Sequence, residues 1–257
     1  MDRRKANETI WLWVEKTIPQ KVLLFIPIFY IYSFIDLAFV QNDNIWGEWF
    51  ISYTLDIKIL CIILIFLLSP VFSREKEVDM LELILTSKNG VKKLPKIKLL
   101  VGFSLTNILT LLFCIISYIS FGIGHSTWNW GIPIEDMALY RFIGNPGLVT
   151  YQDMRNQVWL NSFLALNLVA AFVLLVSAKS KQSLRTAIIA ILVNFIFSIR
   201  NIMTESFPIN LIWNEMLNEK NILFIGKKIQ IIYIIQVLYI IIYLVLYKLI
   251  CTVYQKK

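Results

Sequence analysis

Charged residues are scarce in this chain of 257 residues, and their scarcity narrows the class of protein. Asp, Glu, Lys and Arg make up 16 % of the sequence, whereas soluble domains carry about 25 %. The residues AVILMFWYC make up 58 %, which is more apolar surface than a soluble fold can bury. The composition excludes intrinsic disorder, a collagen-like repeat and a disulfide scaffold. It argues against a soluble domain and predicts a polytopic membrane protein.

The chain also has few of the residues that several kinds of active site require. Its cysteines lie within apolar runs, as small hydrophobic residues do, and indicate neither a disulfide framework nor a metal site: Cys61, Cys114 and Cys251. The single histidine, His125, lies outside the apolar runs, which excludes an H-E-x-x-H metal site and argues against a Ser–His intramembrane hydrolase. Gly226–Lys227 lacks the rest of the P-loop pattern, so we expect no nucleotide to bind in that manner.

Six apolar stretches approach or exceed the length of about 20 residues that crosses a bilayer. We predict spans at residues 22–40, 51–72, 99–123, 158–178, 186–203 and 229–250. The expected fold is all-α, with six transmembrane helices in one transmembrane domain and both termini on the same side. Residues 1–21 are amphipathic and are expected to form either an elbow helix beside the bundle or a plain interfacial anchor.

The basic residues predict the orientation of the bundle. Most of the 25 Lys and Arg residues lie in the segments 1–21, 73–98, 179–185 and 248–257. By the positive-inside rule these segments and both termini face the cytoplasm, and the long loops 124–157 and 204–228 are extracellular. The net charge of +8 is thereby explained by orientation, and we expect no nucleic-acid partner.

Three ionisable residues lie within the predicted spans: Asp36, Asp56 and Lys58. An ionisable residue at membrane depth is a candidate functional residue. All three lie toward the predicted outer ends of their spans, so two interpretations stay open. In the first, they have a structural role, in which they pair with one another or extend to the interface. In the second, they line a substrate path. Our hypothesis is that Asp36 pairs with Lys58 across the first two spans.

The segment 73–98 carries a second charged pattern. Acidic residues follow Ser73, which can cap a helix, and Asn89–Gly90 can end that helix. Apolar residues recur between them at helical spacing: Val78, Leu81, Ile84 and Leu85. This pattern predicts an amphipathic helix at the cytoplasmic end between spans two and three. Loop composition alone is equally compatible with a surface helix whose charges are solvated.

The same segment carries a resemblance to a known family. The stretch Glu77-Val-Asp-Met-Leu-Glu-Leu-Ile-Leu-Thr-Ser, followed by a basic run that ends in Lys98 before a span, resembles the ABC-2 type (NosY-like, type V) transporter permeases. Their loop reads roughly E-x-G-T-L-E-L-L-L-S. Glu77 and the run 81–86 fit this pattern, whereas Asp79 and Met80 stand where the family favours Gly and Thr. The six-span plan and the amphipathic N-terminal segment are also similar to that family.

The resemblance implies the membrane subunit of an ATP-driven exporter. ATP and Mg would be held by a separate ABC ATP-binding subunit, so no catalysis and no cofactor are expected in this chain. A second permease chain, identical or paralogous, would complete the transporter in the bacterial cytoplasmic membrane. The resemblance places these residues at or beside the contact with the ATP-binding subunit: Glu75, Glu77, Asp79, Leu81 and Glu82.

The apolar spans lack the charged midplane cluster that a small polar solute needs. We therefore expect a hydrophobic or amphipathic cargo such as a peptide, a lipid or a drug, and by analogy an antimicrobial or toxic peptide. One alternative is a membrane sensor or immunity scaffold that transports nothing. An intramembrane enzyme is the least favoured alternative.

Overall fold

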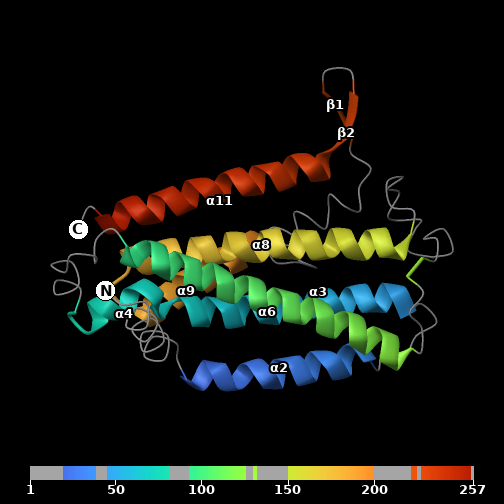
Figure 1. Ribbon diagram of the computed structural model, residues 1–257, viewed down its shortest axis with the longest axis horizontal. Helices are drawn as coiled ribbons and strands as arrows, with labels where there is room; N and C mark the ends of the chain where they lie inside the picture. The colour runs from blue at the N-terminus through green and yellow to red at the C-terminus, as the bar shows by residue number, and fades with distance from the viewer. Residues whose placement is uncertain are drawn as a thin grey trace, which may run out of the picture.

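The structure is a computed structural model that describes residues 20–38, 45–80, 93–125, 130–131, 150–199, 221–224 and 227–255. Within these residues the chain forms a bundle of helices and one short hairpin (Figure 1). The elements are α2 (Gln20–Ala38), α3 (Ile45–Leu68), α4 (Pro70–Glu77), α6 (Leu94–Gly124), α8 (Tyr151–Lys179), α9 (Ser183–Ile199), β1 (Asn221–Phe224), β2 (Lys227–Gln230) and α11 (Ile231–Gln255). The predicted interfacial segment 1–21 lies almost wholly outside the described residues.

Among the described residues, four helical stretches are long and apolar enough to cross a membrane: Leu55–Glu77, Leu94–Gly124, Tyr151–Lys179 and Gln236–Val253. Two shorter apolar helices, Val22–Ala38 and Ser183–Asn194, accompany them. The expectation of a helical membrane protein is confirmed at this level. The count of six spans and the cytoplasmic position of the termini stay predictions.

Helix α8 lies at the centre of the bundle and contacts α3, α4, α6, α9 and α11. Its buried face carries small side chains, which allow neighbouring helices to approach closely: Ala165, Ala170, Ala171 and Ala178. Helices α2 and α11 lie at opposite edges (Figure 1). In the apolar stretch Gln236–Val253 of α11, only 17 % of the residues are buried, so most of its side chains are available to lipid.

Polar side chains join the helices inside the bundle, where no water can satisfy them. Tyr53 of α3 donates a hydrogen bond to Ser162 of α8 at 3.0 Å. Gln236 of α11 donates to the side-chain oxygen of Asn161 at 2.7 Å. Tyr30 of α2 donates to a backbone carbonyl of α6 at 2.7 Å. Each of these bonds ties a different pair of helices, so the polar groups fix how the helices are placed relative to one another.

The structure corrects two boundaries of the predicted outer loops. Helix α8 begins at Tyr151, within the predicted loop 124–157, because Thr150 and Asp153 form a reciprocal capping box. Strands β1 and β2 form an antiparallel hairpin with Asn221 opposite Gln230, in a region where the sequence predicts a loop and the start of a span. The expected all-α class therefore holds for the bundle but not for this hairpin.

Gly124, the last residue of α6, is a test of how tightly α2 packs. A Cβ atom at this position would lie 1.9 Å from the carbonyl oxygen of Ala38, at the end of α2. A Cβ at Gly102 would meet only the flexible ends of two side chains, Leu174 at 3.1 Å and Leu68 at 3.5 Å. We expect Gly124→Ala to lower the free energy of unfolding by about 1–3 kcal/mol because backbone must move. Thermal unfolding in detergent measures this, with Gly102→Ala as the matched control; equal midpoints for the two variants would contradict it.

Candidate functional site

The candidate site is built around α4, the short helix that follows a break in the chain after α3. Pro70 has no N–H group, and its ring would clash with the carbonyl four residues earlier, that of Phe66. The Phe66 carbonyl instead accepts a hydrogen bond from the Ser69 hydroxyl at 3.1 Å. The α3 helix therefore ends at Leu68, and the chain starts again at Pro70 as α4.

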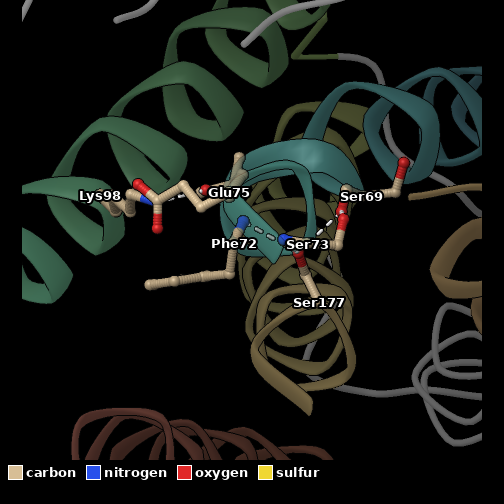
Figure 2. A network of polar contacts seen from close by, with 7 residues as sticks. Ser69, Phe72, Ser73, Glu75, Lys98 and Ser177 are labelled. Carbon is tan, nitrogen blue, oxygen red and sulfur yellow. Dashed lines mark hydrogen bonds and ion pairs between the residues drawn. The ribbon is translucent and has the colours of Figure 1, made fainter. Parts of the chain in front are cut away.

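The N-terminus of α4 is capped by a side chain from another helix. Ser69, the residue at the N-cap position, makes no side-chain cap. The hydroxyl of Ser177, on α8, accepts from the backbone N–H groups of Phe72 at 3.0 Å and Ser73 at 3.1 Å, and donates to the Ser69 carbonyl at 2.7 Å (Figure 2). Ser177 thus satisfies backbone groups that a helix normally leaves without partners at its start.

This geometry shows that the predicted cap was wrong. The sequence predicts Ser73 as the residue that starts the helix, but Ser73 lies inside α4. Its hydroxyl donates to the Ser69 carbonyl at 2.8 Å, one turn earlier. The helix begins before Ser73 because Pro70 favours the first position of a helix.

A buried ion pair joins α4 to the start of α6. The ammonium nitrogen of Lys98 lies 2.5 Å from a carboxylate oxygen of Glu75, and the Lys98 side chain is fully buried (Figure 2). Lys98 also donates to the carbonyl of Val71 at 2.8 Å and lies 5.0 Å from the ring centre of Phe72. A buried charge is tolerated when it is paired and hydrogen-bonded, as Lys98 is here.

Two further side chains join α4 to the connection between α8 and α9. Lys76 donates to the carbonyl of Ala178, and at 3.0 Å to that of Ser180. The carboxylate of Glu77 accepts from the hydroxyl of Ser183 at 3.0 Å. Ser183 is the first residue of α9, where the helix dipole favours a negative charge. We call the five side chains that fix α4 the α4 anchor: Glu75, Lys76, Glu77, Lys98 and Ser177.

The C-terminus of α4 ends in a tight turn. Asp79 has φ 52°, and Met80 donates its N–H to the Glu75 carbonyl at 2.9 Å while Asp79 donates to that of Lys76 at 3.4 Å. These two bonds form a Schellman motif, in which the residue with positive φ is usually Gly. Position 79 is also where the resembled family favours Gly. The helix expected to continue past Val78 is therefore interrupted here.

The structure separates the five residues predicted to contact an ATP-binding subunit. Glu75 is 8 % exposed and directed at Lys98, and Glu77 contacts Ser183. Asp79 is exposed, between Val78 and Met80, each of which is 54 % exposed. Leu81 and Glu82 lie outside the described residues.

Sequence reasoning missed three residues of the anchor: Lys76, Lys98 and Ser177. Ser177 gives no signal, because a serine near the end of an apolar helix has many possible partners. Lys98 gives a weak signal, since it directly precedes the apolar run from Leu99 and a solvated lysine is not expected there. The basic run that contains Lys98 hides this signal, because Lys96 in the same run is exposed and the sequence does not distinguish the two lysines.

The predicted intramembrane charges are arranged differently from our hypothesis. Asp56 is fully buried, midway along α3, and accepts a hydrogen bond from the Ser33 hydroxyl of α2 at 2.5 Å. The structure does not show the expected pairing of Asp36 with Lys58. Asp36 and Lys58 are both half-buried, on α2 and α3.

In comparisons with known proteins, no family model, no curated protein and no solved structure matches the chain. Across the described ranges, no group of three or more His, Cys, Asp or Glu side chains is placed to hold a metal ion. The apolar helices and the α4 anchor are therefore the features of the chain that bear on its function.

The buried ion pair gives a test of the anchor. Lys98→Met leaves the Glu75 carboxylate buried without its partner, and we expect the free energy of unfolding to fall by about 3–5 kcal/mol. The double variant Lys98→Met with Glu75→Gln removes both charges and should recover most of that loss. Thermal unfolding in detergent measures both, with exposed Lys96→Met as the control. A double variant no more stable than Lys98→Met would argue against the pair.

The turn at Asp79 gives a second test. Asp79→Gly removes the steric cost of positive φ and should raise the free energy of unfolding by about 0.5–1 kcal/mol. Asp79→Val should lower it, because a β-branched side chain is strongly disfavoured at positive φ. Thermal unfolding in detergent measures both variants. A stabilising Asp79→Val substitution would show that residue 79 does not have a positive φ.

Proposed function

We propose that this chain is the membrane-spanning permease subunit of an ATP-driven exporter in the bacterial cytoplasmic membrane, powered by a separate ATP-binding subunit. The observation that carries the proposal is the α4 anchor. A short polar helix at one end of a membrane bundle is fixed at once to α6, α8 and the start of α9. A permease without its own nucleotide site needs such an element to receive movement from a partner.

The anchor supports a transmission mechanism. The exposed residues Val78, Asp79 and Met80 follow α4 directly and offer two apolar side chains beside a charge. A partner that moves this turn would move α4 with it, because the Schellman motif joins the turn to the helix. Since Lys98 and Ser177 join α4 to α6 and α8, the displacement would reach the centre of the bundle.

The proposal assigns different roles to the acidic residues. Glu75 and Glu77 are positioning residues, because their carboxylates are used inside the protein. The contact with the ATP-binding subunit is assigned to the turn at Val78–Met80 and to the residues that follow, including Leu81 and Glu82. The second permease chain would pair with this one in the bilayer.

The helices also support the class of cargo. Where the structure describes their side chains, the core of the bundle is apolar, and uncharged hydroxyl and amide groups make polar contacts between its helices, such as Tyr53 with Ser162 and Gln236 with Asn161. Such a bundle offers apolar surface with few charges. A hydrophobic or amphipathic molecule, such as a peptide, lipid or drug, suits it better than a small ionic solute.

Purification of the tagged chain from its native membranes tests the proposal. We expect a P-loop ATPase to co-purify and to hydrolyse ATP in the complex. Val78→Asp with Met80→Asp should weaken its binding at least about tenfold, since charges replace exposed apolar contacts. Lys181→Asp, an exposed change at the same end of the bundle, is the matched control.

The result is measured as the amount of ATPase retained at increasing salt. Thermal unfolding must show that both variants are folded. If no ATPase co-purifies with the wild-type chain, or if both variants retain it equally, the proposed exporter is wrong. A sensor or scaffold would give the first of these results.

A further inference from the structure

Asp56 is a buried acid that the proposed function does not use. It lies midway along α3, and its side chain has no exposed surface. One carboxylate oxygen accepts from the Ser33 hydroxyl of α2, and the other, also buried, has no hydrogen-bond partner. In the described part of the chain, no Lys or Arg lies within ion-pair distance of this carboxylate.

This environment cannot hold a negative charge at low cost. A buried carboxylate with one hydroxyl partner and no cation loses most of its hydration energy, and such groups become neutral instead. The surroundings add no compensation. On α2, Asp36 and Tyr32 are the groups that interact electrostatically with this part of α3, and one of them is itself an acid. On α3, Lys58 is two residues farther along and is not among the groups that act electrostatically on Asp56.

We propose that Ser33 and Asp56 form a proton-binding site between α2 and α3, in which neutral Asp56 holds α2 against the bundle. The Ser33 hydroxyl donates to one oxygen and leaves the other without a partner, and burying that other oxygen costs less free energy in a neutral carboxyl group than in an ionised one. Loss of the proton therefore favours separation of α2 from α3, where water or a headgroup can reach the carboxylate. This inference does not depend on the exporter or on its ATPase.

Helix α2 is suited to such movement. It is an edge helix that contacts α3 and α6, and its outward face exposes large apolar side chains to lipid: Leu24, Phe25, Ile28, Ile31 and Ile35. Behind that face, Ser33 is fully buried against Asp56. The proton site is thus one helix away from lipid.

Infrared difference spectroscopy on the full chain in lipid vesicles tests the proton directly. Subtracting the spectrum of Asp56→Asn from that of the wild type near neutral pH should show loss of the C=O band of a protonated carboxyl group. The band should fall about tenfold per pH unit once the pH exceeds its midpoint. The matched control is Asp36→Asn, which should leave the C=O band assigned to Asp56 in place. If Asp56→Asn removes carboxylate bands near neutral pH, the proposal is overturned.

Hydrogen–deuterium exchange tests the effect on α2. After correction for intrinsic exchange, the amides of α2 in the wild type should exchange faster as the pH rises through the midpoint of the infrared band, while those of α8 should not. Asp56→Asn mimics the neutral acid, so its α2 should show no such change. If the exchange of α2 is independent of pH in the wild type as well as in Asp56→Asn, the proton does not hold α2 and this part of the proposal is overturned. Neither measurement requires an ATPase, so failure here is distinguishable from failure of the proposed function.

Discussion

The hydroxyl of Ser177 is the contact on which the α4 end of this bundle depends. Pro70 interrupts the helical hydrogen bonds of α3, and backbone groups freed near a membrane must find partners within the protein. Ser177 accepts from two of them and donates to a third group, the Ser69 carbonyl. Because Ser177 belongs to the central helix α8, the break in the chain becomes an attachment to the core of the bundle.

The charged contacts of α4 depend on that attachment. Once Ser177 sets the start of α4, Glu75 is directed toward α6 and Glu77 toward α9, since residues two apart on a helix point in different directions. Lys98 can then be buried at low cost, because its ammonium group meets a carboxylate, a carbonyl and an aromatic ring. The carboxylates of Glu75 and Glu77 therefore hold α4 in place within the protein and are not directed at a partner.

The sequence predicts the class of fold well because apolar length is a strong signal in a membrane. Long apolar helices overlap the predicted spans 51–72, 99–123, 158–178 and 229–250, and Thr150 with Asp153 could have located the start of α8. The site was less predictable. Glu75 and Glu77 have the same residue type in one acidic run, yet one is buried against Lys98 and the other contacts Ser183. Their partners lie far away in sequence, and periodicity carries no information about such contacts.

The length of α8 has a consequence for how the bundle lies in the bilayer. This helix has 29 residues, is capped by Thr150 at one end and holds α4 at the other. At about 1.5 Å per residue it is about 43 Å long, whereas the hydrocarbon layer is about 30 Å thick. The mismatch means that α8 tilts or that its ends extend into the headgroup layers. Since α8 contacts most of the other helices, its tilt sets the tilt of the bundle. A change in local bilayer thickness would change that tilt and, through Ser177, the position of α4.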